Sequence, residues 1–443
     1  MPEQKVELVV IGDELLAGAV KDANASWLAD LLLSIGISVS RVTFAPDDFK
    51  ELKEILDQAL ARTGFVISCG GLGPTADDCT RAVAADLFDR ELYTNKRLLN
   101  LLAERYKKLG RKMDSVAKTQ AKVPRGAELF TNPAGAAPGV VLKDESRTLI
   151  LLPGVPVEMQ AITQTALRSY LEENFALSVP HILLLRTVGT IETELAKRVA
   201  PVLSRLSDLK VSYLPRRGGI DLRIQAACAA EKSQALKELS RILEDDLYAV
   251  GRKELSEVVV ELLLSRGETL SVAESCTGGM LASSIVDVAG SSNYFLGGVV
   301  SYSNMAKEDF LGVPHILLKR HGAVSSQVAK AMAEGVRERF NSTCGIGITG
   351  IAGPGGATRT KPVGLVYIAL ACKDSVRIKR FVFPGDRSSI RQRSVIAALD
   401  LLRRYLRAGL THASPPTEKK IKAGLTCFVL LPFRQRRNGA LIS

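Results

Sequence analysis

The sequence predicts an α/β fold class, in which two α/β domains with mostly parallel or mixed sheets are joined by a small α+β domain. Three observations support this prediction. The chain has 443 residues, enough for about three domains at roughly 150 residues each. Strand-like apolar runs alternate with amphipathic helical patterns in both halves of the chain, an order typical of parallel sheets covered by helices. With 46% hydrophobic residues, each domain has enough apolar side chains for a core.

The first domain is predicted over residues 1–170. Its first 90 residues alternate in the order βαβαβ, with expected strands at 6–11, 37–44 and 65–69 and helices at 22–35 and 47–60. A later strand at 149–152 leads into a helix that contains Glu158 and completes the domain. The alternation predicts a mostly parallel sheet with helices on both faces.

Two further domains and a tail follow. Residues 171–252 predict the small α+β connecting domain, with strands at 181–188 and 219–227 and helices at 192–206 and 230–247. Residues 253–412 predict the second α/β domain, with helices at 255–264, 278–288, 325–340 and 388–406 and strands at 269–273, 297–302, 344–348, 363–372 and 376–383. Residues 413–443 are a basic tail that we expect to be poorly ordered.

Positive charge is concentrated near the end of the chain. The 59 Lys and Arg outnumber the 47 Asp and Glu, which gives a net charge of +12. From residue 401 to 443, nine basic residues face one acid, a balance of +8. A nucleic-acid-binding surface spreads its basic residues over a folded face, whereas we expect these to lie past the last core helix. The sequence therefore predicts no nucleic-acid partner.

Composition also excludes several classes of protein. No apolar run reaches the roughly 18–20 residues that span a membrane, and the first residues lack the pattern of a secretory leader. Seven scattered Cys without a CxxC pair argue against a disulfide framework or a structural zinc site, and four His argue against a multi-His metal centre. We expect a cytoplasmic protein without a membrane partner, in which carboxylates and phosphate oxygens hold any metal.

A glycine-rich segment, 70–78, directly follows the third expected strand and is called the first glycine loop. It lies at the carboxyl end of the sheet, where open α/β sheets bind ligands. Small residues let backbone N–H groups approach a phosphate, and Asp77 and Asp78 can hold a divalent cation there. Glu158 is expected to converge on the same edge. The alternative, equally weighted, is that Thr75 and the aspartates only cap the next helix.

A serine and a lysine form the second candidate site. Ser275 lies where the strand at 269–273 meets a helix, so its hydroxyl is expected at the sheet edge beside the first helical N–H groups. Lys307 follows the next strand, with Tyr302 as a helper, and Ser–Lys pairs replace Ser–His–Asp in some acyl-transfer enzymes. Burial favours the proton loss that such a base needs. The open alternatives are a Ser helix cap with a solvated lysine, and Cys276 as the nucleophile.

A second glycine-rich segment, 347–356, is called the second glycine loop and holds five glycines in ten residues after another strand. It can bind a phosphate or place Thr349 in an anion hole, or it can be a flexible loop. Arg387 and Arg391 follow at the start of the last helix and offer guanidinium forks for a phosphate or carboxylate. An arginine in a first helical turn opposes the helix dipole, which favours a functional role.

These strings, in this order, resemble the competence/damage-inducible protein A (CinA) family. The resemblance covers residues 5–408 and rests on the segments 12–16, 70–78, 152–156, 273–279 and 347–356. It implies a molybdopterin-binding-like domain at the N-terminal end and a nicotinamide-nucleotide amidohydrolase domain at the C-terminal end. The family hydrolyses the carboxamide of nicotinamide mononucleotide to nicotinate mononucleotide and ammonia, without a cofactor in that domain. It also includes ADP-ribose pyrophosphatases that need a divalent metal (Mg, Mn or Co) and K⁺ in the N-terminal domain.

The resemblance also implies roles for individual residues. In the C-terminal domain it implies Ser275 as nucleophile, Lys307 as general base, Tyr302 as positioning group and Thr349 as oxyanion or substrate contact. The implied substrate-binding residues are Arg387, Arg391, Gly353, Gly278, Gly71, Gly73 and Thr75. The implied metal ligands are Asp78, Asp77 and Glu158.

Two other function classes compete with this interpretation. The family name and the basic tail suggest a DNA-uptake or recombination accessory protein, and the N-terminal half alone suggests a molybdopterin-cofactor-related protein. Neither explains the Ser275 region. We therefore expect small nucleotides as the partners, nicotinamide mononucleotide and ADP-ribose, and a homodimeric chain.

Overall fold

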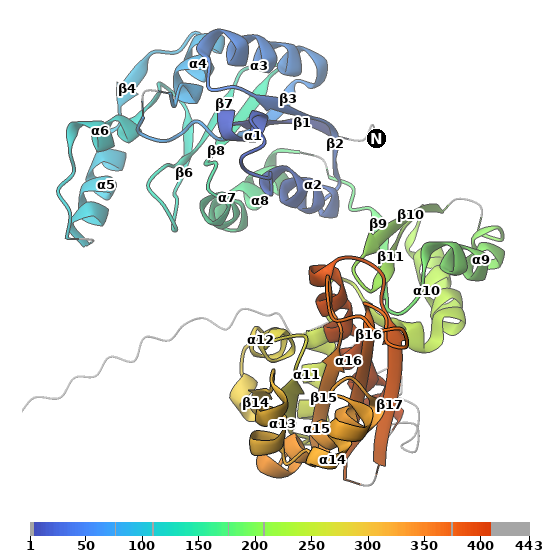
Figure 1. Cartoon of the computed structure of the whole chain (residues 1–443). Coiled ribbons are helices and arrows are strands. Elements are labelled where there is room, and N and C mark those ends of the chain that lie inside the picture. Colours follow the sequence, from blue (N-terminus) through green and yellow to red (C-terminus); the bar gives the residue numbers. More distant parts are fainter. Residues whose placement is uncertain are drawn as a thin grey trace, which may run out of the picture. The chain divides into compact units, whose positions relative to one another are not determined.

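The computed structural model describes residues 4–408, except positions 76, 109, 176, 207, 208 and 374. The chain divides into two compact units, Met1–Ile182 and Leu183–Ser443 (Figure 1). Each contains helices and sheets, and the predicted α/β fold class is confirmed. In the part of the chain that the structure describes, no helix is both long and apolar enough to cross a membrane. The predicted basic tail, 413–443, lies outside the described residues.

The first unit is built on a six-stranded sheet of order β2-β1-β3-β8-β7-β6. Its strands are β1 (Gln4–Ile11), β2 (Ile37–Ala45), β3 (Phe65–Cys69), β6 (Glu128–Phe130), β7 (Gly139–Lys143) and β8 (Thr148–Leu152). The first three strands and β8 are parallel, whereas β6 and β7 are antiparallel. The carboxyl ends of β1, β3 and β8 therefore meet at one edge of the sheet.

Helices cover both faces of this sheet. They are α1 (Asp13–Leu16), α2 (Asn24–Ser34), α3 (Phe49–Thr63), α4 (Thr80–Leu87), α5 (Lys96–Lys108), α6 (Ser115–Lys118), α7 (Pro156–Ile162) and α8 (Arg168–Asn174). Figure 1 shows α3 and α4 above the sheet and α2, α7 and α8 below it, and each side has its own hydrophobic cluster. Because both faces are covered, every residue of β3 is buried.

The part of this unit between residues 90 and 148 contains elements that the sequence did not predict. Short strands β4 (Leu92–Thr94) and β5 (Lys122–Pro124) form a separate two-stranded sheet, and α5 stands beside them. Three-residue strands are too short to show a period of two, so sequence patterns could not distinguish them from loops.

The second unit begins with the connecting domain, whose four-stranded sheet has the order β10-β11-β9-β12. Its elements are β9 (His181–Thr187), α9 (Glu192–Leu203), β10 (Lys210–Arg216), β11 (Gly219–Ala226), α10 (Ala229–Leu243) and β12 (Leu247–Val250). The two predicted strands and two predicted helices are present, but the helices end earlier than predicted, and β10 and β12 were missed. Exposed and half-buried residues alternate along β10, which therefore lacks a continuous apolar run.

The C-terminal domain has a five-stranded sheet of order β14-β13-β15-β16-β17. Its strands are β13 (Leu270–Glu274), β14 (Phe295–Val300), β15 (Cys344–Gly350), β16 (Leu365–Cys372) and β17 (Ser375–Val382). Its helices are α11 (Leu255–Arg266), α12 (Met280–Val286), α13 (Asn304–Leu311), α14 (His315–His321), α15 (Ser326–Arg339) and α16 (Arg387–Ala408). Strands β14, β13 and β15 are parallel, and β16 and β17 form the predicted antiparallel hairpin.

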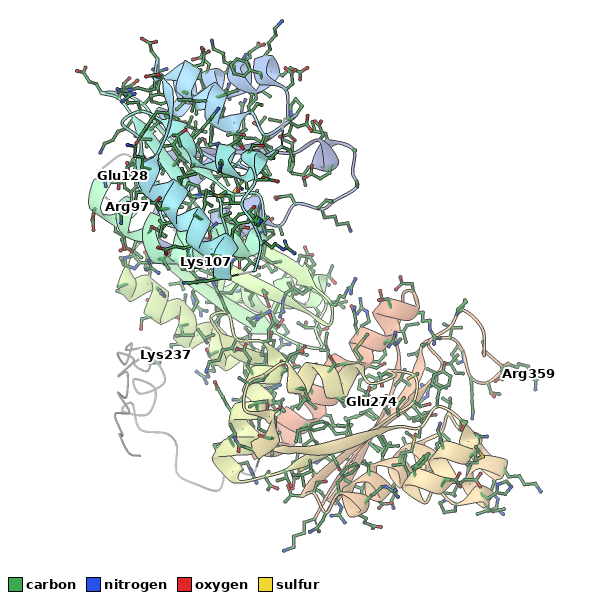
Figure 2. All side chains as sticks on the ribbon, turned by 90° about the vertical axis from the view of Figure 1, so that its left-hand side faces the viewer. Arg97, Lys107, Glu128, Lys237, Glu274 and Arg359 are labelled. Atoms are coloured by element: carbon green, nitrogen blue, oxygen red, sulfur yellow. The ribbon has the colours of Figure 1, made fainter. Side chains whose placement is uncertain are left out.

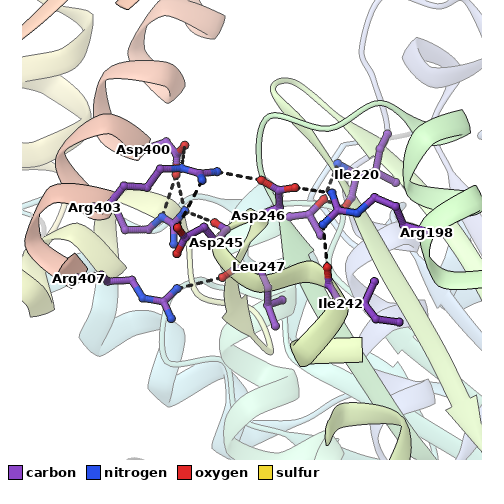
Figure 3. Close-up of polar contacts among 11 residues, drawn as sticks. Arg198, Ile220, Ile242, Asp245, Asp246, Leu247, Asp400, Arg403 and Arg407 are labelled. Carbon is purple, nitrogen blue, oxygen red and sulfur yellow. Dashed lines mark hydrogen bonds and ion pairs between the residues drawn. The ribbon is translucent and has the colours of Figure 1, made fainter. Parts of the chain in front are cut away.

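A network of charged residues joins α16 to the connecting domain (Figure 3). Arg403 is fully buried; it binds Asp400 on its own helix and donates to the main-chain oxygen of Asp245. Asp246 accepts one hydrogen bond from Arg404 at 2.9 Å and one from Arg198 at 2.6 Å. The carboxylate of Asp246 therefore links α9 to α16.

This network corrects the prediction for the basic residues near the chain end. Arg403, Arg404 and Arg407 were assigned to charge beyond the last core helix, but they lie within α16. Arg403 and Arg404 form ion pairs, and Arg407 donates to the main-chain oxygen of Leu247. These three side chains stabilise the second unit and are not a free cationic patch.

Candidate active sites

Parallel strands bring the catalytic candidates of the C-terminal domain to one sheet edge. Ser275 follows β13 directly, and its N–H donates to the Ile348 carbonyl of β15 at 3.0 Å. On the other side, the Ser301 N–H after β14 donates to the Glu274 carbonyl at 2.8 Å. The segments after β13, β14 and β15 are therefore held side by side, as the sequence predicted from strand order.

A buried carboxylate fixes the backbone around Ser275. Glu274 is 1% exposed and accepts hydrogen bonds from the N–H groups of Gly279, Leu281 and Ala282 at 3.0, 3.1 and 2.8 Å. Figure 2 shows its side chain inside the ribbon of the C-terminal domain. The negative charge of Glu274 also interacts favourably with the positive, N-terminal end of the α12 dipole. The helix therefore begins at Met280, later than the predicted residue 278, and Ser275 stands in the short loop before it.

Lys307 lies next to this loop and is completely buried. Its Nζ is 3.2 Å from Ser275 Oγ, 2.6 Å from the Ser301 carbonyl oxygen and 3.4 Å from the Tyr302 carbonyl oxygen. Within the described chain, no carboxylate forms an ion pair with it. Burial lowers the pKa of the Lys307 ammonium, because desolvation disfavours its charged form. The alternative of a solvated surface lysine is wrong.

The contacts of Lys307 define the direction of its lone pair. An ammonium group has three N–H bonds, and its three contacts are Ser275 Oγ and two carbonyl oxygens. A carbonyl oxygen can only accept, so the neutral amine keeps both carbonyl contacts with its two remaining N–H bonds. Its lone pair then faces Ser275 Oγ, which is the orientation of a general base toward a nucleophile.

Cys276 has the properties of a buried thiol. It is 6% exposed, and burial raises its pKa to about 11, so little thiolate exists near neutral pH. The Lys307 contact is made by the hydroxyl of Ser275 and not by this sulfur. The geometry therefore favours Ser275 over Cys276 as nucleophile.

The two arginines of α16 reach the loops around Ser275. Arg387 donates to the Gly353 carbonyl oxygen at 2.7 Å and to the Tyr302 hydroxyl at 3.2 Å. Arg391 donates twice to the Thr277 carbonyl oxygen, at 3.3 and 2.7 Å. These contacts gather the segments after β13, β14 and β15 around one helix end and leave cationic groups beside Ser275.

The other predicted residues of this site differ in what they can contact. Thr349 is buried, and its hydroxyl donates to the Ala323 carbonyl oxygen at 2.8 Å, so its proton already has an acceptor. The N–H groups of Cys276 and Thr277 have no acceptor in another residue of the described chain and lie directly after Ser275. Gly278 has a φ of +61° and lies against Arg391, where a Cβ would be 3.4 Å from the guanidinium. The main-chain N–H groups after Ser275 are therefore better candidates than the Thr349 hydroxyl as hydrogen-bond donors to an oxyanion at this site.

The first unit has a cavity of about 550 Å³ at the carboxyl ends of β1, β3 and β8. Its lining includes residues from three segments singled out in the sequence: Glu14 from 12–16, Gly71, Gly73 and Asp78 from 70–78, and Glu158 from the helix after the strand at 149–152. The expected convergence of these segments on one edge is therefore observed.

Asp78 shapes the first glycine loop. One carboxylate oxygen accepts from the Gly73 N–H at 2.7 Å, and the other accepts from the Thr75 N–H at 2.8 Å and from the Thr75 hydroxyl. Helix α4 begins at Thr80 without a side-chain cap, so the alternative that Thr75 and the aspartates cap it is wrong. Asp77 is exposed and does not line the cavity.

Carboxylates gather around this cavity, but they do not form a complete metal site. Desolvation and the nearby charges of Asp13, Glu14 and Asp78 raise the pKa of Asp47, whereas a hydrogen bond from the Asp13 N–H lowers it. Glu158 accepts a hydrogen bond from Asn132 at 2.6 Å. In the described part of the chain, no three His, Cys, Asp or Glu residues form a group that could hold a metal. The donor chemistry fits a divalent cation only if a ligand such as a diphosphate supplies further oxygens.

Sequence reasoning missed several groups at these sites. Glu274 was noted only as part of the segment 273–279 and was given no role of its own. A charged residue at the end of an apolar strand indicates a buried charge that is held by hydrogen bonds. Asp47 was treated as the opening of a helix. Asn24 hydrogen-bonds the Gly154 carbonyl, and its own side-chain oxygen is buried without a partner at the cavity. Only the fold shows that this acceptor lacks a partner among the residues that the structure describes.

Family models match three consecutive parts of the chain. Residues 7–173 match the probable molybdopterin binding domain, residues 184–249 match the damage-inducible protein CinA KH domain, and residues 252–406 match the CinA C-terminal domain. Fold and site therefore define a multidomain α/β protein with a Ser–Lys pair in a CinA C-terminal domain.

Relatives cover nearly the whole chain. A putative competence-damage inducible protein of Caldicellulosiruptor saccharolyticus is 38% identical over 406 residues, which are 90% of this chain and 98% of that protein. A CinA-like protein of Citrifermentans bemidjiense is 40% identical and covers 93% of this chain and 99% of its own length. The crystal structure of competence/damage inducible protein CihA from Agrobacterium tumefaciens is 39% identical, with a TM-score of 0.34, over 34% of this chain and 93% of that chain. The chain belongs to the CinA family.

Glu274 offers a test of the site's architecture. We expect Glu274→Ala to destabilise the protein by about 2–3 kcal/mol, because three N–H groups at a buried helix start lose their acceptor. Glu274→Gln keeps one acceptor oxygen and is expected to cost less. Thermal unfolding of both variants measures the difference, and equal midpoints for Glu274→Ala and the unmodified protein would contradict the assigned role.

Proposed function

We propose that the C-terminal domain is a cytoplasmic amidohydrolase that converts nicotinamide mononucleotide to nicotinate mononucleotide and ammonia. The observation that carries this proposal is the buried Lys307 amine, 3.2 Å from Ser275 Oγ and held by two main-chain carbonyls. A neutral lysine beside a serine hydroxyl at a strand–helix junction is the arrangement of a Ser–Lys acyl-transfer site. The substrate class comes from the family resemblance, and cationic groups of α16 suit its phosphate.

The proposed reaction uses groups of this chain and water. Ser275 Oγ attacks the carboxamide carbon while Lys307 takes the hydroxyl proton. We assign the stabilisation of the oxyanion to the N–H groups of Cys276 and Thr277, which follow Ser275 directly. Lys307 then gives its proton to the leaving nitrogen, the C–N bond breaks and ammonia departs. Water, deprotonated by Lys307, hydrolyses the acyl ester and restores Ser275.

Arg387 and Tyr302 form one wall of the proposed substrate site. The Tyr302 ring is 66% exposed, and its hydroxyl accepts from Arg387, so the two side chains support each other beside Lys307. We assign Arg387 and Arg391 to the substrate phosphate, and Tyr302 and Gly353 to positioning these cations. Because Thr349 already donates to Ala323, we assign it to substrate contact through its oxygen or main chain rather than to the oxyanion.

Ammonia release tests the nucleophile. We expect Ser275→Ala to lower ammonia release from nicotinamide mononucleotide by about 10³-fold or more, because no acyl ester can form. Cys276→Ala is the matched control at the adjacent position, and its rate is expected to stay close to that of the unmodified protein. Loss of activity in Cys276→Ala together with retention in Ser275→Ala would overturn the assignment.

The pH profile tests the base. Lys307 must be neutral to accept a proton, so kcat/KM is expected to rise with pH by about tenfold per unit below its lowered pKa and to level off above it. Lys307→Arg keeps the positive charge but cannot lose its proton near neutral pH, so it is expected to be inactive across the range. A profile that falls as pH rises through this region would exclude Lys307 as the base.

We further propose that the cavity of the first unit is the active site of a metal-dependent ADP-ribose pyrophosphatase. Its size suits a nucleotide, and the N–H groups of the first glycine loop can approach a diphosphate. We assign Gly71 and Gly73 to the diphosphate, and Asp78 and Glu158 to a divalent cation such as Mg, Mn or Co, with K⁺ as a further cofactor. Thr75 lies outside the lining and donates to Asp78, so we assign it to holding the loop rather than to a direct diphosphate contact. The cation would neutralise the diphosphate, while Asp47 and Glu14 supply the nearby negative charge that favours its binding.

The two adjacent aspartates of the first glycine loop test whether metal-dependent activity needs the carboxylate inside the cavity or only negative charge nearby. We expect Asp78→Asn to lower metal-dependent hydrolysis of ADP-ribose by about tenfold or more, because it removes a carboxylate from the cavity. Asp77→Asn is expected to have little effect, because Asp77 is exposed and outside the lining. Product formation is measured with and without each metal. Equal losses of activity in the two variants would contradict both the assignment of Asp78 to the cation and the view that Asp77 takes no part.

An exposed apolar surface supports the proposed homodimer. The edge strand β14 exposes Leu296 and Val300, and α13 exposes Met305 at 69%. An unprotected edge strand with apolar neighbours is a typical surface for pairing with a second chain. This surface adjoins Tyr302, so the proposed dimer would lie beside the Ser275 site.

The nucleic-acid alternative has less support. The connecting domain matches a KH domain model, and KH domains bind nucleic acid through a Gly-x-x-Gly loop. The connecting domain contains only Gly189, Gly218 and Gly219 between residues 183 and 250, and no pair has that spacing. The molybdopterin alternative concerns the first unit alone and leaves the Ser275–Lys307 pair unexplained.

A further inference from the structure

The second unit contains another cavity, of about 580 Å³, between the connecting domain and the C-terminal domain. The loops 188–192 and 215–220 form one side, and β17 with α16 forms the other. This volume lies in the range of small-molecule sites, which often occur between domains. None of the residues assigned above to catalysis or substrate binding lines it. We call it the interdomain cavity.

Two stacked aromatic rings form part of its wall. Phe381 and Phe383 lie two residues apart at the end of β17 and therefore face the same side of the strand. Their ring centroids are 5.0 Å apart and their planes differ by 12°. Ile396 and Leu401 of α16 add aliphatic surface. The outer face of such a stacked pair favours an aromatic ligand that can extend the stack by one more ring.

The interdomain cavity also has two cationic side chains, which have no partner in the described chain. Lys379 lies on the same side of β17, and Arg393 reaches in from α16. The Nε of Arg393 is buried and has no hydrogen-bond acceptor. A buried donor without an acceptor is unfavourable, and a ligand oxygen would satisfy it.

The remaining charges at the cavity do not cancel these cations. Arg216 pairs with Asp221, and Arg404 pairs with Asp400. Glu192 is an exposed carboxylate at the rim. Two unpaired cations against one exposed acid favour an anionic ligand over a neutral or cationic one.

We propose that the interdomain cavity is a second nucleotide site of this unit, which binds a free nucleoside monophosphate. The base stacks on Phe381 and Phe383, and the phosphate binds Lys379 and Arg393. This site is distinct from the Ser275 site and from the cavity of the first unit. It is fixed in shape by the contacts of Arg403 and Arg404 with the connecting domain (Figure 3).

Photolabelling of the full chain with 8-azido-AMP, followed by peptide mapping, tests the location directly. We expect saturable labelling of peptides from β17 or α16, and AMP should protect them. Labelling confined to the first glycine loop or to the Ser275 region would overturn the proposal. The readout does not depend on amidohydrolase or pyrophosphatase activity, so its failure is distinct from failure of the proposed function.

Variants then test the residues. Arg393→Gln and Lys379→Gln are each expected to raise the AMP concentration needed for protection by about tenfold. Arg380→Gln is the matched control, because Arg380 neighbours Lys379 on β17 but does not line the cavity. Ala397→Trp fills the cavity and should abolish the labelling; a thermal midpoint close to that of the unmodified protein shows that it is folded. Unchanged protection in Arg393→Gln and Lys379→Gln would overturn the phosphate assignment.

Fragments of the nucleotide test the two halves of the site. Adenosine lacks the phosphate and ribose 5-phosphate lacks the base, so each should protect at least about tenfold less well than AMP. Protection by ribose 5-phosphate as strong as that by AMP would overturn the stacking assignment. Stronger protection by a short oligoadenylate than by AMP would overturn the proposal of a free mononucleotide and indicate a nucleic-acid end instead.

Discussion

The buried carboxylate of Glu274 is the constraint on which the C-terminal site depends. It ends β13 and accepts three N–H groups from the start of α12, so strand and helix are joined through one side chain. The residues between them, Ser275 to Gly279, form the short loop that connects the two elements. The hydroxyl of Ser275 and the main-chain N–H groups after it are thereby fixed at the sheet edge, where a reacting carbonyl can meet both.

The same hydrogen bonds explain how a lysine can lose its proton nearby. A free carboxylate one residue from Ser275 would pair with Lys307 and favour the ammonium form. Glu274 instead has its oxygens bound to helix N–H groups, and Lys307 contacts only a hydroxyl and two carbonyls. Burial then acts without a compensating ion pair and lowers the pKa of Lys307. The carboxylate that caps α12 is thus bound to main-chain N–H groups, and the contacts of Lys307 are a hydroxyl and two carbonyl oxygens.

Strand order explains how much of this was predictable from sequence. Ser275 and Lys307 follow adjacent parallel strands, so their meeting at one edge follows from the alternating pattern alone. A charged residue at the end of an apolar strand was the only signal for Glu274. The hydrogen-bond partners of Glu274 and Asp78 could not be predicted, because both bind backbone N–H groups whose direction is set only after the chain turns. The short strands β4 and β5 gave no period, and Arg403 looked like tail charge because its partner Asp245 is distant in sequence.

The two proposed active sites lie at the carboxyl ends of parallel strands in two different sheets and have opposite electrostatics. In the first unit, Glu14, Asp47 and Asp78 surround the cavity, so an anionic diphosphate would be repelled unless a cation accompanied it. In the C-terminal domain, Arg387 and Arg391 lie beside the Ser275 loop, and a phosphorylated substrate meets positive charge directly. The opposite signs of charge at these two strand ends are the reason why we propose a metal ion for the first cavity and assign the phosphate of the second substrate to arginines.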